Sequence, residues 1–316
     1  MMTLVNIKET NDRIHSYIHR TPILTNETIN RLIGANICFK CENFQKTGSF
    51  KARGGLNAVL QIAEIVKPSS FTTHSSGNHA QVLAYAAKKF GIPAYIVMPR
   101  TAPQVKKDAV RSYGAEVIEC EPSLKAREES VENIIDSMGS FLIHPFNNDM
   151  VISGQATVAK ELIEDSGQHL DCIVAPIGGG GLLSGISLAT HYLSPLTIVY
   201  GAEPEGAAEA IQSFESGIVQ KVAFPETIAD GLLASLSECT LGHIRTYVKN
   251  IFLVNDEEIK YAMKLVWERM KIIIEPSSAV PLAVVIKRKE FFAGQKIGIV
   301  ISGGNVDFSE LPFTTL

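Results

Sequence analysis

The 316-residue sequence has few cysteines, no excess of basic residues and no long apolar run near its start. Its five cysteines are odd in number and scattered, which excludes a disulfide framework; they stand at positions 38, 41, 120, 172 and 239. With 29 basic and 33 acidic residues the net charge is −4, so the chain lacks the cationic field that holds nucleic acid. The start, "MMTLVNIKETNDRIHSYIHR", predicts neither a signal peptide nor a membrane anchor, and we expect a cytoplasmic protein.

Two pairs of metal-binding residue types occur without a complete metal motif. Cys38 and Cys41 form a C-x-x-C, but no second Cys or His pair follows at a finger-like spacing, so a strand of buried small residues is expected. His15 and His19 stand four apart on an expected helix in a polar setting that lacks a carboxylate pair. We therefore expect a solvated helix face there.

The chain contains two series of alternating strands and helices. The first runs from about residue 70 and includes the strands "SSFTTHSS", "AYIVMP", "AEVIEC" and "FLIHPF". The second begins near residue 155, with the helix "QATVAKELIEDSG" and the strands "DCIVAPI", "LTIVYGAEP" and "KIGIVISGGN". Such alternation predicts parallel sheets with right-handed crossovers. The length and the two series predict two α/β lobes, with a cleft where the strand ends meet.

Three segments that follow strands are suited to binding anions. The run "PIGGGGLLSG" at 176–185 places four glycines before a helix, which makes either a phosphate cup or a tightly packed turn. The run "HSSGNHAQ" at 74–81 gathers hydroxyl, amide and imidazole groups at a helix start, which suits a carboxylate or a simple capped turn. A third strand ends in glycines in "VISGGN" at 300–305.

A lysine among small residues indicates what kind of ligand these anion-binding segments could hold. Lys51 lies in "KTGSFKARGG" at the start of an expected helix, with glycines on both sides. A lysine can form a Schiff base with an aldehyde, and pyridoxal phosphate is an aldehyde cofactor that also needs a phosphate cup. The residues therefore lead to the hypothesis that Lys51 is the covalent anchor of pyridoxal phosphate.

Together these motifs resemble the fold type II pyridoxal-phosphate enzymes, in the branch of serine/threonine dehydratases and serine racemases. The matching runs span residues 42 to 307 in the family's order: "ENFQKTGSFKARG", "THSSGNHAQ", "GIPAYIVMP", "PIGGGGLLSG", "ETIADGL", "LVWERMKIIIEPSSA" and "ISGGNVD". The resemblance implies two doubly wound α/β lobes with parallel-type sheets, as in tryptophan synthase β, and the cofactor in the cleft between them. It implies a large cofactor-binding domain of residues 1–69 and 148–316 and a small domain of residues 70–147.

The resemblance also implies roles for individual residues. Lys51 is expected to hold the cofactor and to remove the α-proton of an L-amino acid. Phe50 is expected to pack against the cofactor, Asn78 to hydrogen-bond its ring hydroxyl and Ser302 to face its pyridine nitrogen. The phosphate is expected to be bound by the backbone N–H groups of Gly178, Gly179, Gly180, Gly181 and Leu182. The expected substrate contacts are Ser75, Ser76, Asn78 and His79. A hydroxyl at Ser302 makes the ring a weaker electron sink, which suits elimination of a β-substituent.

Further expectations from the resemblance concern a cation, a nucleotide and a partner. Glu203, the carbonyl of Ala207 and Glu209 match the family's cation site, and oxygen ligands suit Mg2+, Mn2+ or Ca2+. The family usually has aspartate where Glu209 stands. Some relatives bind ATP at a dimer interface, where Gln81 and Tyr113 match, so ATP is a candidate effector and a homodimer is expected.

The sequence also departs from the family pattern. Ala80 stands where the family usually has glycine, and Ser153 and Ala156 replace residues of the usual "AGQGT". Ala234 falls near a position where the mammalian racemase has a substrate-contacting serine. This last difference weakens the expectation of serine racemisation more than that of elimination.

The leading interpretation is an ammonia-lyase that converts L-serine or L-threonine to a 2-oxo acid. The second interpretation is a serine racemase with elimination as a side reaction, since Ser76 could transfer a proton on the face of the substrate opposite Lys51. The third is a threo-3-hydroxyaspartate ammonia-lyase, whose substrate needs an added cation, for which Arg53 and Arg127 are candidates. A non-catalytic cofactor-binding sensor is disfavoured by the proton-transfer pair of Lys51 and Ser76, and a cysteine-synthase-like enzyme by the run "GSFKARG".

Overall fold

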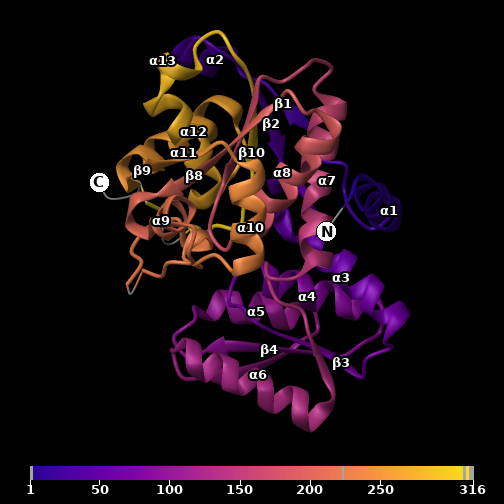
Figure 1. Ribbon diagram of the computed structural model, residues 1–316. Coiled ribbons are helices and arrows are strands. Elements are labelled where there is room, and N and C mark those ends of the chain that lie inside the picture. The colour runs from indigo at the N-terminus through magenta and orange to yellow at the C-terminus, as the bar shows by residue number, and fades with distance from the viewer. Residues whose placement is uncertain (1–2, 223, 309–310, 313–316) are drawn as a thin grey trace.

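The computed structural model describes residues 3–222, 224–308 and 311–312 and divides the strands between two sheets (Figure 1). The six-stranded sheet has the order β1-β2-β10-β7-β8-β9, in which β1 is antiparallel to β2 and all other neighbours are parallel. Its strands are β1 (Ile23–Leu24), β2 (Asn36–Cys41), β7 (Cys172–Pro176), β8 (Ile198–Pro204), β9 (Asn250–Val254) and β10 (Lys296–Ile301). The second sheet is parallel throughout, with the order β5-β4-β3-β6. Its strands are β3 (Ser70–His74), β4 (Ala94–Pro99), β5 (Glu116–Cys120) and β6 (Ser140–Leu142).

Helices cover both faces of the larger sheet. Side chains of α2, α11 and α12 pack in one core, and those of α7, α8 and α10 pack in a second core on the opposite face. The helices of this part are α1 (Leu4–Ile14), α2 (Glu27–Ile33), α7 (Asp149–Asp165), α8 (Gly181–Leu193), α9 (Glu209–Ser216), α10 (Glu238–Tyr247), α11 (Asp256–Met270), α12 (Pro276–Lys287) and α13 (Lys289–Phe292). The described connections contain the short 3-10 helices η1 (Glu42–Phe44), η2 (Lys46–Gly48), η3 (Glu205–Ala207) and η4 (Asp230–Leu232).

The smaller sheet is also covered on both faces. Its helices are α3 (Lys51–Ile65), α4 (Asn78–Lys89), α5 (Gln104–Ser112) and α6 (Leu124–Met138). Side chains of α3, α4 and α5 form one core, and Val131 and Ile134 of α6 pack on the other face. Helix α3 also packs along α7 of the larger part, so it bridges the two lobes. The boundaries expected after residues 69 and 147 stay a prediction.

The sequence explains why these elements form. Parallel strands covered on both faces read as continuous apolar runs, and all five residues of β7, "CIVAP", are buried. Helices begin at polar caps: the side chains of Asn148 and Ser237 accept bonds from the first backbone N–H groups of α7 and α10. The C-x-x-C lies in β2, where Cys38 and Cys41 belong to the cores on opposite sides of the sheet, so the two thiols cannot share a ligand.

The structure confirms the predicted fold of two α/β domains with parallel sheets and corrects three details. The strand expected over "FLIHPF" ends at Leu142, because the His144 ring accepts bonds from the backbone N–H groups of Phe146 and Asn147 in a turn. Helix α7 begins at Asp149, six positions before the expected start at residue 155. Helix α1 ends at Ile14, so it carries neither of the two N-terminal histidines.

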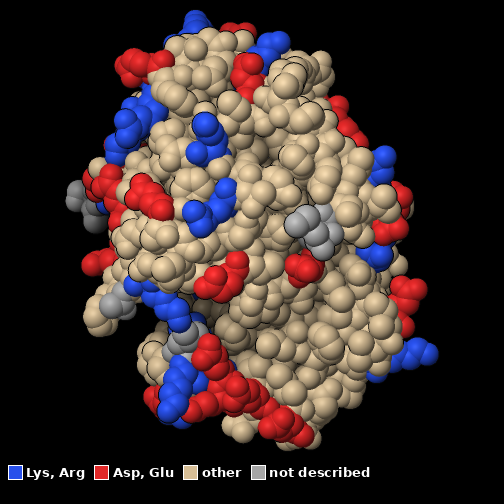
Figure 2. All heavy atoms as spheres, viewed as in Figure 1, with Lys and Arg blue, Asp and Glu red and all other residues tan. Residues whose placement is uncertain are grey.

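The surface agrees with the charge balance of the sequence. Figure 2 shows basic and acidic side chains interspersed over the viewed face, with a row of acidic side chains over α6. None of the described helices is long and apolar enough to span a membrane.

Candidate active site

The expected site residues meet where strand ends from both sheets face each other. The segments that follow β3, β6, β7 and β10 all leave the carboxyl ends of their strands, which is where ligands bind in open α/β sheets. Hydrogen bonds join these segments across the two parts of the chain. Lys51 Nζ donates to the carbonyl of Pro145 after β6, and Asn305 Nδ2 after β10 donates to Asn78 Oδ1 at the start of α4.

Lys51 is the first residue of α3 and is held from both sides. The backbone N–H of Phe50 donates to the carbonyl of Ser302 at 2.9 Å, which fixes the start of α3 against the end of β10. Lys51 Nζ lies 3.0 Å from the Pro145 carbonyl and 5.2 Å from the centre of the Phe50 ring. Burial lowers the pKa of the Lys51 ammonium to about 8, and the negative charge of Glu275 partly opposes this shift. The neutral, nucleophilic amine is therefore accessible near neutral pH.

The glycine loop after β7 presents unused donors. Among the described residues, the backbone N–H groups from Gly178 to Leu183 donate no hydrogen bond, whereas that of Ser184 donates to the Gly180 carbonyl as the helix begins. Gly180 has a φ of 83°, which L side chains rarely adopt. A row of free N–H groups at a helix start is suited to an anion.

Close packing also requires glycine in this loop. A Cβ atom on Gly179 would lie 2.3 Å from Phe146 Cδ1, and one on Gly181 would lie 2.9 Å from Phe146 Cβ. Both interpretations of the four glycines, a tight turn and an anion cup, therefore describe features that coexist in the structure.

Asn78 is oriented by a buried carboxylate. Its Nδ2 donates to Glu275 Oε1 and Oε2 at 3.0 and 3.2 Å, and its Oδ1 accepts from Asn305 Nδ2 at 2.8 Å. Glu275 is 5% exposed and also accepts from the backbone N–H of Asn305 at 3.1 Å. Burial raises the pKa of Glu275 to about 7, and the Asn78 bond acts in the opposite direction.

Ser75 and Ser76, which follow β3, differ from the nearby His79 in burial and in hydrogen bonding. Ser75 and Ser76 are half-buried, and in the described part of the chain the Ser76 hydroxyl has no hydrogen-bond partner. His79 is buried, its Nε2 lies 3.0 Å from the Ile143 carbonyl, and burial lowers its pKa to about 3. Since Nε2 must donate to that carbonyl, Nδ1 is an acceptor, and it has no partner among the described residues.

Ser302 lies at the end of β10 and is 2% exposed. Its Oγ is 3.0 Å from Ser278 Oγ, and Ser278 in turn bonds both the carbonyl and the N–H of Gly303 at 2.7 Å. The two hydroxyls therefore share one buried hydrogen-bond network, and Ser302 retains capacity for a further bond.

Residues 14–303 match the model of a family described as pyridoxal-phosphate dependent enzymes. The chain belongs to this family. It is 49% identical to the beta-hydroxyaspartate dehydratase of Paracoccus denitrificans (strain Pd 1222) over 302 residues, which covers 96% of each chain. Its fold matches the crystal structure of serine racemase from Dictyostelium discoideum with a TM-score of 0.92, at 49% identity over 97% of this chain and 99% of that chain. The crystal structure of a threonine deaminase from T.th. matches with a TM-score of 0.93 at 40% identity, again over 97% and 99%.

The family assignment makes this protein a pyridoxal-phosphate-dependent enzyme of a lyase and racemase group, and the described site fits that cofactor. The free N–H groups of Gly178–Leu183 could hold its phosphate. The Lys51 amine could bind its aldehyde carbon. Asn78 and Ser302 lie on the elements that surround Lys51, and each is held there by hydrogen bonds, to Glu275 and to Ser278 respectively.

Glu203 and Glu209, expected to bind a cation, are both buried, as is Ala207. Glu203 accepts from the N–H groups of Ala210 and Ile211, and burial raises its pKa to about 8, with the charge of Glu209 adding to the shift. Glu209 is 2% exposed, and its Oε2 has no partner among the described residues. A buried carboxylate oxygen without a donor has the chemistry of a ligand for a hard cation.

The two arginines considered for a second substrate carboxylate have different positions. Arg53 is fully buried and pairs with Glu42 at 2.7 Å and Glu161 at 2.8 Å, so its candidacy as a pocket cation is wrong. Arg127 on α6 is half-buried and forms no ion pair with a described carboxylate. Burial lowers the pKa of His74, which directly precedes Ser75, and the positive charge of Arg127 adds to this shift.

The sequence interpretation missed Glu275 and the carbonyl of Pro145. Glu275 stands in the quoted run "IIIEPSSA", where a charged residue interrupts apolar ones just before a helix that begins with proline. That interruption was the available signal. Its partner Asn78 is 197 positions away, so the pairing has no local sequence pattern. Pro145 contributes a backbone atom, for which side-chain identity gives no signal.

Proposed function

We propose that the enzyme removes water and then ammonia from L-serine or L-threonine to give a 2-oxo acid. The observation that carries the proposal is the position of Lys51, whose amine has a pKa near 8 and is bonded only to the Pro145 carbonyl among the described residues. An amine of this kind accepts a proton from carbon at neutral pH. Loss of the α-proton and departure of the β-hydroxyl leave an unsaturated amine, which water converts to the 2-oxo acid and ammonia.

The cofactor, when bound, withdraws electron density from the substrate's α-carbon and so makes its proton acidic. The enzyme's own groups orient the reacting parts. The Gly178–Leu183 N–H groups would bind the phosphate, Asn78 would donate to the ring hydroxyl, and Glu275 would hold the Asn78 amide in place. The neutral hydroxyl of Ser302 would face the pyridine nitrogen without charging it, which favours early loss of the β-substituent.

The start of α4 would bind the substrate carboxylate. Helix α4 begins at Asn78 without a side-chain cap, and the Gly77 N–H donates to Ser75 Oγ. The N–H groups of Asn78 and His79 and the O–H groups of Ser75 and Ser76 are therefore the donors available to an anion. His79 has a pKa near 3, so it is neutral and contributes shape and an Nδ1 acceptor to this region, not charge.

Serine racemisation is a second candidate, supported by the free hydroxyl of Ser76. A racemase needs an acid–base group on each face of the planar carbon, and Ser76 has no partner in the described chain that would occupy its hydroxyl. Three curated relatives named serine racemase are 44–49% identical to this chain. Racemisation and elimination would share Lys51 and differ in their need for Ser76.

A third candidate is an ammonia-lyase for 3-hydroxyaspartate, supported by Arg127. A second substrate carboxylate needs a cation, and Arg127 lies close enough to His74 to influence its charge. The beta-hydroxyaspartate dehydratase relative fits this alternative. Replacing Arg127 by methionine would then raise the KM for 3-hydroxyaspartate at least about tenfold and leave that for L-serine nearly unchanged.

One experiment separates the three candidates. Purified holoenzyme is incubated with L-Ser, D-Ser, L-Thr and the diastereomers of 3-hydroxyaspartate, and 2-oxo acid and enantiomer ratio are measured separately. The proposal predicts that 2-oxo acid from L-Ser or L-Thr forms fastest. Faster interconversion of L-Ser and D-Ser would favour the racemase, and faster turnover of 3-hydroxyaspartate would favour the third candidate.

The proposal also includes a divalent cation at Glu203 and Glu209, and a homodimer with ATP as a candidate effector near Gln81 and Tyr113. The unpartnered Glu209 oxygen supports the cation, and Mg2+, Mn2+ and Ca2+ are the ions that such oxygen ligands prefer. Gln81 and Tyr113 lie half-buried at the surface of the smaller part, where a partner could contact them. A cytoplasmic location is supported by the five cysteines, all of which are free thiols.

A further inference from the structure

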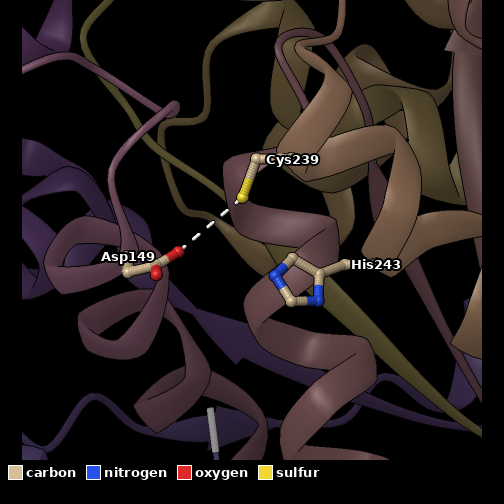
Figure 3. A group of neighbouring side chains, drawn as sticks. All are labelled: Asp149, Cys239 and His243. Carbon is tan, nitrogen blue, oxygen red and sulfur yellow. Dashed lines mark hydrogen bonds between the residues drawn. The ribbon is translucent and has the colours of Figure 1, made fainter. Parts of the chain in front are cut away.

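Asp149, Cys239 and His243 lie together outside the site described above. Asp149 is the first residue of α7, and the other two belong to the first turns of α10 (Figure 3). One ligand atom from each residue lies within 4.8 Å of those of the other two, and Cys239 Sγ is 3.7 Å from Asp149 Oδ1. Figure 3 shows a ring nitrogen of His243 turned toward the gap between the carboxylate and the sulfur.

The local structure leaves these three groups free for a ligand. Cys239 and His243 are four residues apart on α10, so their side chains lie on one face of the helix. Asn148 caps α7, so Asp149 is not needed for that role. In the described ranges, Asp149 forms no ion pair and the His243 ring no hydrogen bond, and all three side chains are at least partly open to solvent.

The three groups match the ligand set of zinc. Thiolate sulfur, imidazole nitrogen and carboxylate oxygen are the usual Zn2+ ligands, with metal–ligand distances of about 2.0–2.3 Å. At a tetrahedral angle these distances separate sulfur and oxygen by about 3.5 Å, close to the observed 3.7 Å. A fourth position would remain open to water, since the cluster reaches the surface.

We propose that Asp149, Cys239 and His243 form a binding site for a borderline-soft divalent cation of the Zn2+ class. Its sulfur ligand separates it in chemistry from the oxygen-only site at Glu203 and Glu209. Coordination removes the proton of the Cys239 thiol to solvent and forms a metal–sulfur bond, with no change in oxidation state.

The site lies behind the glycine loop. Phe146, three positions before Asp149, fills the space beside Gly179 and Gly181, and Thr240, next to Cys239, packs against Gly180. A metal at this position would link the two elements that pack against the glycine loop.

Cd2+ is the probe for the test, because its bond to a thiolate adds a charge-transfer band in the ultraviolet. Holoenzyme is first dialysed against a chelator, then kept in excess Mg2+ so that hard-cation sites are filled. Titration should produce the band with one equivalent of Cd2+, and Zn2+ should remove it by competition. Of the five cysteines only Cys239 is more than slightly exposed, so Cys239→Ser should abolish the band.

Variants of His243 and Asp149 test whether these two residues bind the metal together with Cys239. His243→Ala and Asp149→Asn should each weaken Cd2+ binding at least about tenfold, whereas His169→Ala, an exposed histidine before β7, should leave it unchanged. As a second measurement, Zn2+ should slow alkylation of Cys239 by iodoacetamide in the wild type and lose this effect in the His243 and Asp149 variants. Absence of the band in wild-type holoenzyme overturns the proposal. So does unchanged affinity in both companion variants, which would mean binding to a lone thiolate.

Discussion

Replacing Ser76 by alanine tests the two proton-transfer roles proposed for the site. In the described chain the Ser76 hydroxyl has no hydrogen-bond partner and the side chain is half-buried, so its loss breaks no hydrogen bond between described residues. Substitutions of this kind usually change the free energy of unfolding by no more than about 0.5 kcal/mol. A change in activity in Ser76→Ala can therefore be assigned to chemistry and not to folding.

The expected effect differs between two reactions of the same enzyme. Lys51 alone can remove the α-proton of an L-substrate, whereas forming D-Ser requires a proton to arrive on the opposite face. Loss of one general acid–base group typically costs about 10²–10⁴-fold in rate. We therefore expect D-Ser formation and D-Ser consumption to fall by that factor, while elimination from L-Ser or L-Thr at saturating substrate falls much less. The KM for L-substrates should rise, because Ser76 also lies in the proposed carboxylate site.

The assay follows D-Ser by chiral chromatography and 2-oxo acid by a coupled dehydrogenase, at saturating substrate. Ser278→Ala is a comparison for stability alone, since its buried Oγ bonds both the N–H and the carbonyl of Gly303 at 2.7 Å and also lies 3.0 Å from Ser302 Oγ. That variant should lose about 1–3 kcal/mol of unfolding free energy, because it leaves buried partners unsatisfied. Formation of D-Ser by Ser76→Ala at near the wild-type rate would refute the two-base reasoning.

Three further predictions concern charge and metal. Burial lowers the pKa of Lys51 to about 8, so the rate at which apoenzyme captures pyridoxal phosphate should rise with pH up to about 8 and then level off. The absorbance of the cofactor measures this rate. A rate that continues to rise to pH 10 would contradict the burial of the amine. A chelator should lower the melting temperature of the wild type, and added Mg2+ or Mn2+ should restore it, whereas Glu209→Gln should gain nothing from added Mg2+ or Mn2+. A chelated wild type whose melting temperature does not change with Mg2+ or Mn2+ removes the cation site. Arg53→Met should lose about 3–5 kcal/mol of unfolding free energy in urea, because it leaves buried Glu42 without a cation, whereas Glu161 keeps its pair with Lys40. Arg20→Met, which breaks pairs of a 52% exposed side chain, should lose about 0–1 kcal/mol, and equal losses in the two variants would be contrary to this account.

Regular elements were predictable where burial leaves a repeating pattern. The strand expected at "AYIVMP" has the same bounds as β4, Ala94–Pro99, because a strand covered on both faces must be apolar throughout. The start of α7 was missed because its cap, Asn148, is followed by Asp149, and the polar run resembles a loop until its cap geometry is known. Polar helix starts of this kind have no hydrophobic periodicity to mark them.

The candidate site was predictable where a motif is contiguous in the chain. Lys51, the glycine loop and the Ser75–His79 segment each combine several functional groups within ten residues, and the structure brings the three segments together. Glu275 could not be found in this way, because its role depends on a partner 197 positions distant. The burial of Arg53 likewise depends on Glu161, which lies 108 positions away on another helix.

The central claim is that Lys51 performs the proton transfer of an elimination reaction, and its most direct test is product formation by one variant. Purified wild-type and Lys51→Ala proteins are incubated with L-Ser and with L-Thr, and 2-oxo acid is measured at equal protein concentration and confirmed folding. We predict 2-oxo acid from the wild type and a loss of at least about 10²–10⁴-fold in Lys51→Ala, as expected when a general base is removed. Turnover by Lys51→Ala at a rate close to that of the wild type would contradict the assignment of Lys51.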